Sequence, residues 1–490
     1  MYFNSYIFIF LFVPLTVAGY FVLNHFGKKR IGQAWLVVMS LCFYSYGSPW
    51  LFFLITASMA GNYIFSILMK RFRHPRLFGT LGVVFDLGLL FYFKYFDFFI
   101  SNVNAFFNAG WELKHIILPM GISFYTFQQI SYIVDRARGK AEHYALLDYM
   151  IFVSFFPQLV AGPIVRHDEL VPQFRDASKK SLNWENLTKG SVLFVLGLSK
   201  KILLADMLSL IADHGYGDIA ALDSPGALLT MLAYTFQIYF DFSAYSDMAL
   251  GLGLMMNISL PHNFDQPYCS RSIREFWRRW HITLGQFLAE YVYIPLGGNR
   301  KGKPRRALNT LILFFLSGLW HGAAWNFVLW GLSHGIVIAF EDLLEAPLKK
   351  LESSKPGRFI RWFGAFVIIN FSWVLFRVTS LKQIPQFFGR LFSFSENGSV
   401  SVLAQAADNA FLFIPVQLAK KLLGEHYFIV YTAFVLLLLF VSAVLAGRKE
   451  AWAYAEKGVF KKRMVLPLAI LFFLSVISLS KVVVFLYSNF

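Results

Sequence analysis

The sequence predicts an all-α polytopic integral membrane protein, and three observations support this fold class. Hydrophobic residues make up 57% of the 490 residues and charged residues only 15%, whereas soluble domains carry about 25% charged residues. Long apolar segments recur along the chain, and a helix needs about 20 apolar residues to cross a membrane. The net charge of +17 fits basic cytoplasmic loops, so we expect contact with membrane lipid and no nucleic-acid partner.

The candidate spans follow one another along the whole chain. They lie near 5–25, 31–47, 50–69, 77–100, 116–133, 146–164, 189–212, 226–256, 308–320, 323–341, 360–378, 427–446 and 464–486. Several are short or interrupted by glycine and proline, so we expect about ten to twelve crossings together with re-entrant helices. No internal repeat is evident, which argues against an inverted-repeat transporter.

Basic clusters predict how the chain is oriented in the membrane. They lie at 28–30, 70–76, 300–306 and 448–463 and are expected in the cytoplasm. Both termini of this multi-pass protein are then expected outside the cytoplasm. The region 134–190 is basic at both ends, so 146–164 either crosses or dips in and returns.

The same features divide the chain into three parts. Residues 1–378 are expected to form the core, and 379–426 an extracytoplasmic segment. Its stretch 403–422 is partly amphipathic, which suits a helix on the outer membrane surface or a docking site for a partner. Residues 427–490 are expected to add the last transmembrane helices.

The segment 271–294 carries cations on one predicted helix face. At about 100° per residue, Arg271, Arg274, Arg278 and His281 fall in one stripe, bordered by Trp277. The arginines either reach toward lipid headgroups or bind a phosphate-bearing donor that arrives from the cytoplasm. We assign Arg274, Arg278 and Trp277 to donor binding.

A second histidine lies deep in an apolar segment. His321 follows about 13 apolar residues, which span about 20 Å as a helix. The neighbouring Gly318 and Gly322 permit close packing and a break in the helix. Ionisable groups at such depth are costly and indicate function, and we expect Trp320, Trp325 and Asn326 to support this histidine.

A third polar group lies at 236–248, where Asp241 and Asp247 occur among Tyr239, Ser243, Tyr245 and Ser246. We favour a network that joins helices, with hydroxyls or arginines as partners of the carboxylates. Asp241 and Tyr245 then support the channel, and a proton relay is the alternative.

Several kinds of chemistry have no matching motif. The sequence lacks a Walker loop, a dinucleotide fingerprint, HExxH and a nucleophile elbow. Two cysteines, Cys42 and Cys269, complete no zinc set, so no metal is expected. A neutral imidazole near pH 7 is a natural general base for a hydroxyl, and the placement of His321 suits a reaction that moves an acyl group from a thioester across the membrane.

Three runs resemble the membrane-bound O-acyltransferase superfamily. They are FQIYFDFSAYSDMALGLGLMMNISLPHNFDQPY, REFWRRWHITLGQFLAEYVYIPLGG and SGLWHGAAWNFVLWGLSHG, with FFPQLVAGPIVRHDELVPQF upstream. The branch that they resemble most is the bacterial polysaccharide O-acetyltransferases that act on alginate and peptidoglycan, with the teichoic acid D-alanyltransferases as a cousin.

The resemblance implies a ring of helices around a thin central region. It implies that His321 is the catalytic histidine at the base of an outward-facing funnel and that His281 is the second active-site histidine, near the cytoplasmic mouth. Acetyl-CoA is the implied donor, and a polysaccharide hydroxyl is the implied acceptor. An extracytoplasmic, esterase-like partner is implied to complete the transfer.

The last residues resemble an F-x-Y-x-x-F signature of polysaccharide acylation systems, with Phe485, Tyr487 and Phe490 at its positions. The resemblance implies that Tyr487 receives the acyl group and passes it on, and an aryl ester is a reactive donor. The alternative is an aromatic anchor at the interface.

Three other functions stay open. The first is D-alanyl transfer from a phosphopantetheine carrier protein. The second is a transporter with Asp241, Asp247 and Lys94 as an ion path, and the third is a scaffold that needs neither histidine.

Overall fold

The computed structural model describes residues 1–26, 29–395, 398–399, 403, 424, 427–457, 462–480 and 485–486. These residues form an all-α molecule, and the described part of the chain contains no β-strand. One isolated antiparallel bridge joins Phe264 to Trp280. The prediction of an all-α membrane protein is therefore confirmed.

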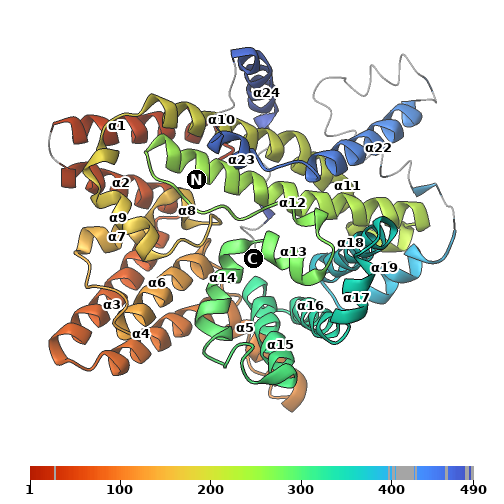
Figure 1. Ribbon diagram of the computed structural model, residues 1–490, viewed down its shortest axis with the longest axis horizontal. Helices are drawn as coiled ribbons and strands as arrows, with labels where there is room; N and C mark the ends of the chain where they lie inside the picture. The colour runs from red at the N-terminus through yellow and green to blue at the C-terminus, as the bar shows by residue number, and fades with distance from the viewer. Residues whose placement is uncertain are drawn as a thin grey trace.

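The helices of the N-terminal third are red to gold in Figure 1, and most of them form a group at one end of the molecule. Its elements are η1 (Phe8–Phe12), α1 (Val13–His25), α2 (Lys29–Ser45), α3 (Trp50–Phe72), α4 (Pro75–Leu90), η2 (Phe91–Tyr95), α5 (Phe96–Phe107), α6 (Ile122–Ala137), α7 (Leu146–Ser154), α8 (Phe156–Leu159) and α9 (His167–Arg175).

The middle of the molecule is built around α12 (Ser224–Met255), which crosses the centre of Figure 1 and is buried along most of its length. It packs against α10 (Trp184–Lys200), η4 (Lys201–Ala205) and α11 (Asp206–Gly217). The contact with α10 depends on glycine, because a Cβ on Gly190 would lie 2.4 Å from the carbonyl oxygen of Gly251. Two helix backbones therefore touch here with no side chain between them.

The remaining described helices complete the molecule. They are α13 (Ile273–Arg279), α14 (Ile282–Leu288), η7 (Ala289–Tyr293), α15 (Gly302–His321), α16 (Trp325–Leu343), α17 (Glu345–Leu351), α18 (Lys355–Arg377), α19 (Gln383–Leu391), α22 (Tyr427–Ala446), α23 (Ala451–Glu456) and α24 (Val465–Ile477). Short 3₁₀ turns lie at Ala177–Lys180, Ile219–Ala221, Pro267–Cys269, Lys462–Met464 and Ser478–Ser480.

Five described helices are long and apolar enough to cross a membrane. They are Phe8–His25, Trp50–Phe72, Pro75–Phe107, Lys355–Arg377 and Ile429–Ala446, and α16 with α17, bent by 80°, makes a sixth if the pair is one span. The helix α12 is not among them, and its buried polar residues, such as Thr230, Asp241 and Asp247, lower its hydropathy. Apolarity alone therefore identifies the outer spans better than the inner helices.

Two expected spans differ from the helices observed. The segment 116–133 is helical only from Ile122 onward, and 146–164 is divided between α7 and α8 at Phe155. The nine residues of α7 reach only about 13 Å as a helix, so this piece is too short to cross a bilayer. The surface helix expected at 403–422 lies outside the described residues, apart from Leu403.

Candidate active site

The hairpin of α15 and α16 positions the histidine that we expected to be functional. His321 is the last residue of α15, and the chain turns through Gly322 into α16. A Cβ on Gly331 would lie 2.2 Å from the carbonyl oxygen of Phe314, and one on Gly318 would lie 2.3 Å from that of Phe327. The glycines therefore bring the two helices into backbone contact, as the sequence predicts.

The His321 side chain is 1% exposed and is surrounded by aromatic rings. Its ring centroid lies 4.9 Å from those of Trp320 and Trp330 and 5.3 Å from that of Phe376. The rings restrict how the imidazole can turn, which holds it in one orientation.

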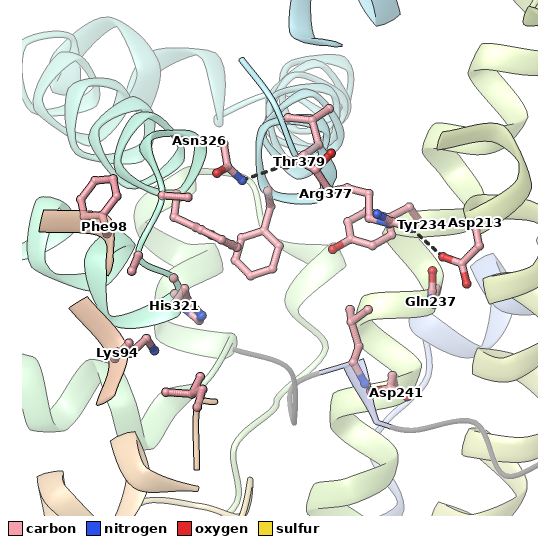
Figure 2. A pocket seen from close by; sticks show the side chains of 18 of the residues that line it. Lys94, Phe98, Asp213, Tyr234, Gln237, Asp241, His321, Asn326, Arg377 and Thr379 are labelled. Atoms are coloured by element: carbon pink, nitrogen blue, oxygen red, sulfur yellow. Dashed lines mark hydrogen bonds and ion pairs between the residues drawn. The ribbon is translucent and has the colours of Figure 1, made fainter. Parts of the chain in front are cut away.

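His321 lines a cavity of about 730 Å³, which we call the histidine cavity (Figure 2). Its lining also includes Asp213 and Thr379, which are exposed, so the cavity reaches the surface. In Figure 2, Lys94 and His321 lie on one side, and Asp241 and Gln237 face them from the other. A buried imidazole is thus accessible to a substrate from outside the protein.

A second cavity of about 610 Å³ collects the residues assigned to donor binding, and we call it the arginine cavity. Arg274, Trp277 and Arg278 line it, together with Arg306. Arg274 and Arg306 both donate to Asp342. Arg278 forms no ion pair with any described residue, which leaves its charge available to a ligand.

The two cavities approach each other along α15. Ser317 lines the arginine cavity and His321 lines the histidine cavity, and four residues of α-helix rise only about 6 Å. Aromatic side chains fill the space between them, since the ring centroid of Trp330 lies 5.6 Å from that of Trp277 and 4.9 Å from that of His321. The region that separates the cavities is therefore thin and apolar.

The prediction of one continuous helix over 271–294 is wrong. The helix α13 ends at Arg279, Trp280 is extended, and His281 has φ of +46° before α14 begins. Contacts from distant residues impose the break, because Ile282 N donates to Asn263 O at 3.0 Å and Trp280 pairs with Phe264. Arg271 precedes the helix, and the cationic stripe that was expected to lead to His281 does not form.

His281 is fully buried and lines neither cavity in the described part of the chain. Its ring centroid lies 4.7 Å from that of Phe242 and 5.7 Å from that of Trp320. The Trp320 ring therefore contacts both histidines. His281, which was expected near the cytoplasmic mouth, lies behind this ring and away from both cavities.

The carboxylates of α12 pair with lysines, not with the hydroxyls or arginines that the sequence suggested. Lys201 Nζ lies 2.6 Å from Asp241 and 2.7 Å from Asp206, and Lys200 Nζ lies 2.7 Å from Asp247. Lys200 also contacts Glu450, which precedes α23. These buried pairs join α10, η4, α12 and the C-terminal part, in agreement with a polar network.

The C-terminal tail reaches the histidine cavity. The main-chain N–H of Leu486 donates to Asp241 at 2.8 Å, and Leu486 lines the cavity. The Phe485 ring lies 5.1 Å from the ring of Tyr245 and 4.5 Å from Lys201 Nζ. Tyr245 thus supports the tail and not the cavity wall, and Tyr487 and Phe490 lie outside the described residues.

Of the residues expected to support His321, two lie at the site. Trp320 is buried against the histidines, and Asn326 lines the cavity while its side-chain amide donates to Val378 O at 3.0 Å. The expectation that Trp325 supports His321 is wrong, because Trp325 does not line the cavity. It is 47% exposed, and its Nε1 donates to Asn102 on α5, because the first turn of α16 turns it away from the cavity.

Several other side chains that line the histidine cavity were not predicted from the sequence as site residues. Arg377, Gln237 and Lys201 line the cavity, as does Lys94, which was considered only for an ion path. The one signal for Lys201 was a pair of lysines inside an apolar segment. Among the described residues, no group of three or more His, Cys, Asp or Glu side chains could hold a metal ion.

The apolar helices, together with a buried histidine between two cavities, define a polytopic membrane protein with a histidine-centred site. The model of the membrane-bound O-acyltransferase family matches residues 136–378. A peptidoglycan O-acetyltransferase of Helicobacter pylori is 40% identical over 410 residues, which is 78% of each chain. The chain belongs to the membrane-bound O-acyltransferase family, and it is an acyltransferase.

Two further relatives differ in the group that their names specify. A protein of Pseudomonas putida named "Probable alginate O-acetylase" is 39% identical over 410 residues, covering 81% of each chain. A teichoic acid D-alanyltransferase of Bacillus subtilis is 28% identical over 270 residues, covering 54% of this chain and 68% of that one. The similarity is stronger and more extensive to proteins named for acetyl transfer.

Proposed function

We propose that this protein transfers an acetyl group from acetyl-CoA, across the membrane, toward a hydroxyl of a cell-envelope or secreted polysaccharide. The observation that carries the proposal is the approach of the two cavities to within one turn of α15, with His321 at the boundary. The relatives named for acetylation of peptidoglycan and alginate support the choice of acyl group and acceptor.

His321 acts as the general base in this proposal. The acceptor oxygen attacks the carbonyl carbon of the thioester while the imidazole takes the hydroxyl proton. The intermediate then collapses, the C–S bond breaks, and the imidazolium returns the proton to the leaving thiolate. The aromatic rings around His321 leave it only 1% exposed, which limits the access of water that would hydrolyse the thioester.

The arginine cavity receives the donor. Arg278 and Arg274 supply the positive charge that binds the phosphates of coenzyme A. Trp277 offers an aromatic face to the part of the donor that lies between the two arginines. The thioester end is then directed toward Ser317 and the thin region beyond it. His281 acts through Trp320, whose ring it contacts, and therefore positions the site instead of touching the donor.

Tyr487 receives the acetyl group before it leaves the protein. The two residues that precede it support this proposal. The main-chain N–H of Leu486 donates to the carboxylate of Asp241, and Phe485 packs on Tyr245. Leu486, the neighbour of Tyr487 in the chain, lines the same cavity as His321. A phenol beside a histidine base can be acylated and can release the group to a second acceptor.

The placement in the membrane follows from the same scheme. The arginine cavity faces the cytoplasm of a bacterial inner membrane, the histidine cavity faces outward, and both termini are outside. The core over 1–378 carries the chemistry, 379–426 lies outside, and 427–490 returns the tail to the site. An extracytoplasmic, esterase-like partner takes the acetyl group to the polymer.

The donor and the tyrosine relay are tested together by mass spectrometry. Purified protein incubated with acetyl-CoA should gain about 42 Da on the C-terminal peptide at Tyr487, and the Tyr487→Phe variant should gain nothing there. Labelling by a D-alanyl carrier protein, and not by acetyl-CoA, would contradict the proposed donor. Wild-type polymer acetylation by Tyr487→Phe membranes would show that the tyrosine is only an anchor.

A further inference from the structure

Lys94 lies on η2, a π-helical turn between α4 and α5 that borders the histidine cavity. Such turns contain one extra residue and are frequent at functional sites, because they redirect a side chain that a regular helix would place elsewhere. The side chain of Lys94 enters the cavity on the side of His321 (Figure 2).

Two side chains of η2 bind the C-terminal end of α15, the helix that carries His321. Lys94 Nζ donates to the carbonyl oxygen of Trp320, and the Tyr95 hydroxyl donates to that of Leu319 at 2.9 Å. The last carbonyls of a helix have no partner inside the helix, and a cation is favourable there. Lys94 is therefore hydrogen-bonded to the residue that directly precedes the proposed base in α15.

Most of the charges that line the histidine cavity are paired within the protein, and Asp97 accepts hydrogen bonds from the main-chain N–H groups of Lys114 and Ile116. Lys201 pairs with Asp241 and Asp206, and Arg377 pairs with Asp213 at 2.7 Å. Lys94 forms no ion pair with any described residue. It donates to two neutral acceptors, the Trp320 carbonyl and the Ser123 hydroxyl, the latter at 3.2 Å.

An ammonium group has three N–H donors, and these two acceptors use two of them. Acyl transfer creates a negative charge on the carbonyl oxygen, and a fixed donor at that position is among the largest contributions to catalysis. A cation that forms no ion pair with a described residue and is held at the cavity wall beside the base has the properties that this role requires.

We infer that Lys94 is a further catalytic residue that stabilises the oxyanion formed when the acceptor hydroxyl attacks the acyl carbonyl carbon. The inference rests on the proposed acyl transfer at His321. As the proton passes to His321, the carbonyl electron pair moves to oxygen and accepts a hydrogen bond from Lys94. When the carbonyl re-forms and the C–S bond breaks, the charge leaves with the thiolate, which His321 protonates.

The competing role is structural, since Lys94 also caps α15. The two roles separate in the variant Lys94→Gln, whose amide can still donate to Trp320 O but carries no charge. Tyr95→Phe is the matched control, because it removes the neighbouring cap bond and leaves the cavity charge unchanged.

The test measures steady-state acetyl transfer from acetyl-CoA by purified variants, with folding checked by thermal unfolding in detergent. Lys94→Gln should lower kcat about 100-fold or more, with KM for acetyl-CoA within about twofold and Tm close to wild type. Tyr95→Phe should lower kcat less than about threefold. Lys94→Arg, which keeps the charge, should retain more kcat than Lys94→Gln.

Three outcomes would overturn the inference. These are a wild-type kcat in Lys94→Gln, an effect on KM for either substrate without an effect on kcat, and equal losses in Lys94→Gln and Tyr95→Phe. His321→Ala is assayed beside them. If it is inactive while Lys94→Gln is normal, the inference alone fails, whereas an active His321→Ala variant would contradict the proposed function itself.

Discussion

Arg278 and Arg274 line the same cavity but have different partners. Arg274 is held by Asp342, which it shares with Arg306, whereas Arg278 has no ion pair with a described residue. A charge that is already paired within the protein gains little from a ligand. Of the two, Arg278 should therefore contribute more to donor affinity and less to folding stability.

We expect Arg278→Gln to raise KM for acetyl-CoA about 10-fold, because a hydrogen bond to a charged group contributes about 1.5–3 kcal/mol. The kcat should change little, since the phosphates lie far from the reacting carbonyl. Arg271→Gln is the control, because Arg271 is exposed and does not line the cavity. A loss confined to kcat, or an equal rise in KM for the control, would contradict this placement of the donor.

Individual residues were predicted from the sequence where their chemistry is unusual. A histidine deep in an apolar segment is costly, and His321 was identified on that basis. Partners were not predictable, because Lys201 and Asp241 are 40 residues apart and meet only when η4 packs on α12. The prediction for Trp325 was wrong because residue type and sequence position near His321 suggested a supporting role, whereas its place in the first turn of α16 directs it to α5.

At the scale of elements, the backbone contact between α15 and α16 fixes the position of His321. Gly331→Ala would place a Cβ 2.2 Å from the carbonyl oxygen of Phe314. Because backbone cannot give way as a flexible side chain can, we expect a loss of about 1–3 kcal/mol in unfolding free energy and a clear loss of activity.

The control for this prediction is Gly364→Ala in α18, where an added Cβ meets nothing within 4 Å. Alanine is favoured over glycine in a helix by about 1 kcal/mol, so this variant should be as stable as wild type or more so. Thermal unfolding in detergent measures both. Equal stability of Gly331→Ala and wild type would mean that the hairpin is looser than the backbone contact implies.

Sequence periodicity predicts some of these helices correctly and misses the break in another. The α15 and α16 hairpin follows from local signals, namely two apolar runs with glycines between them. The break at His281 does not, because Asn263 and Phe264 impose it from outside the segment. Local periodicity therefore favours one continuous helix, and the left-handed backbone of His281 becomes visible only in the fold.

At the scale of the whole molecule, composition was sufficient to predict an all-α membrane protein, but the cavities were not predictable. The histidine cavity is lined by segments far apart in sequence, as Asn326 and Leu486 show. The arrangement of the two cavities separates a cationic chamber from one that contains the base. In the function that we propose, the acyl group passes through the thin region between them while the solutes on the two sides stay apart.

Sided acetyl transfer in proteoliposomes tests this arrangement most directly. With the protein oriented in one direction, acetyl-CoA is added on the face of the arginine cavity and a polysaccharide acceptor, with its partner enzyme, on the other face. We predict acetylated polymer with wild-type protein and none with His321→Ala in equally folded vesicles. Polymer acetylation by His321→Ala, or transfer only when donor and acceptor share one face, would contradict the account.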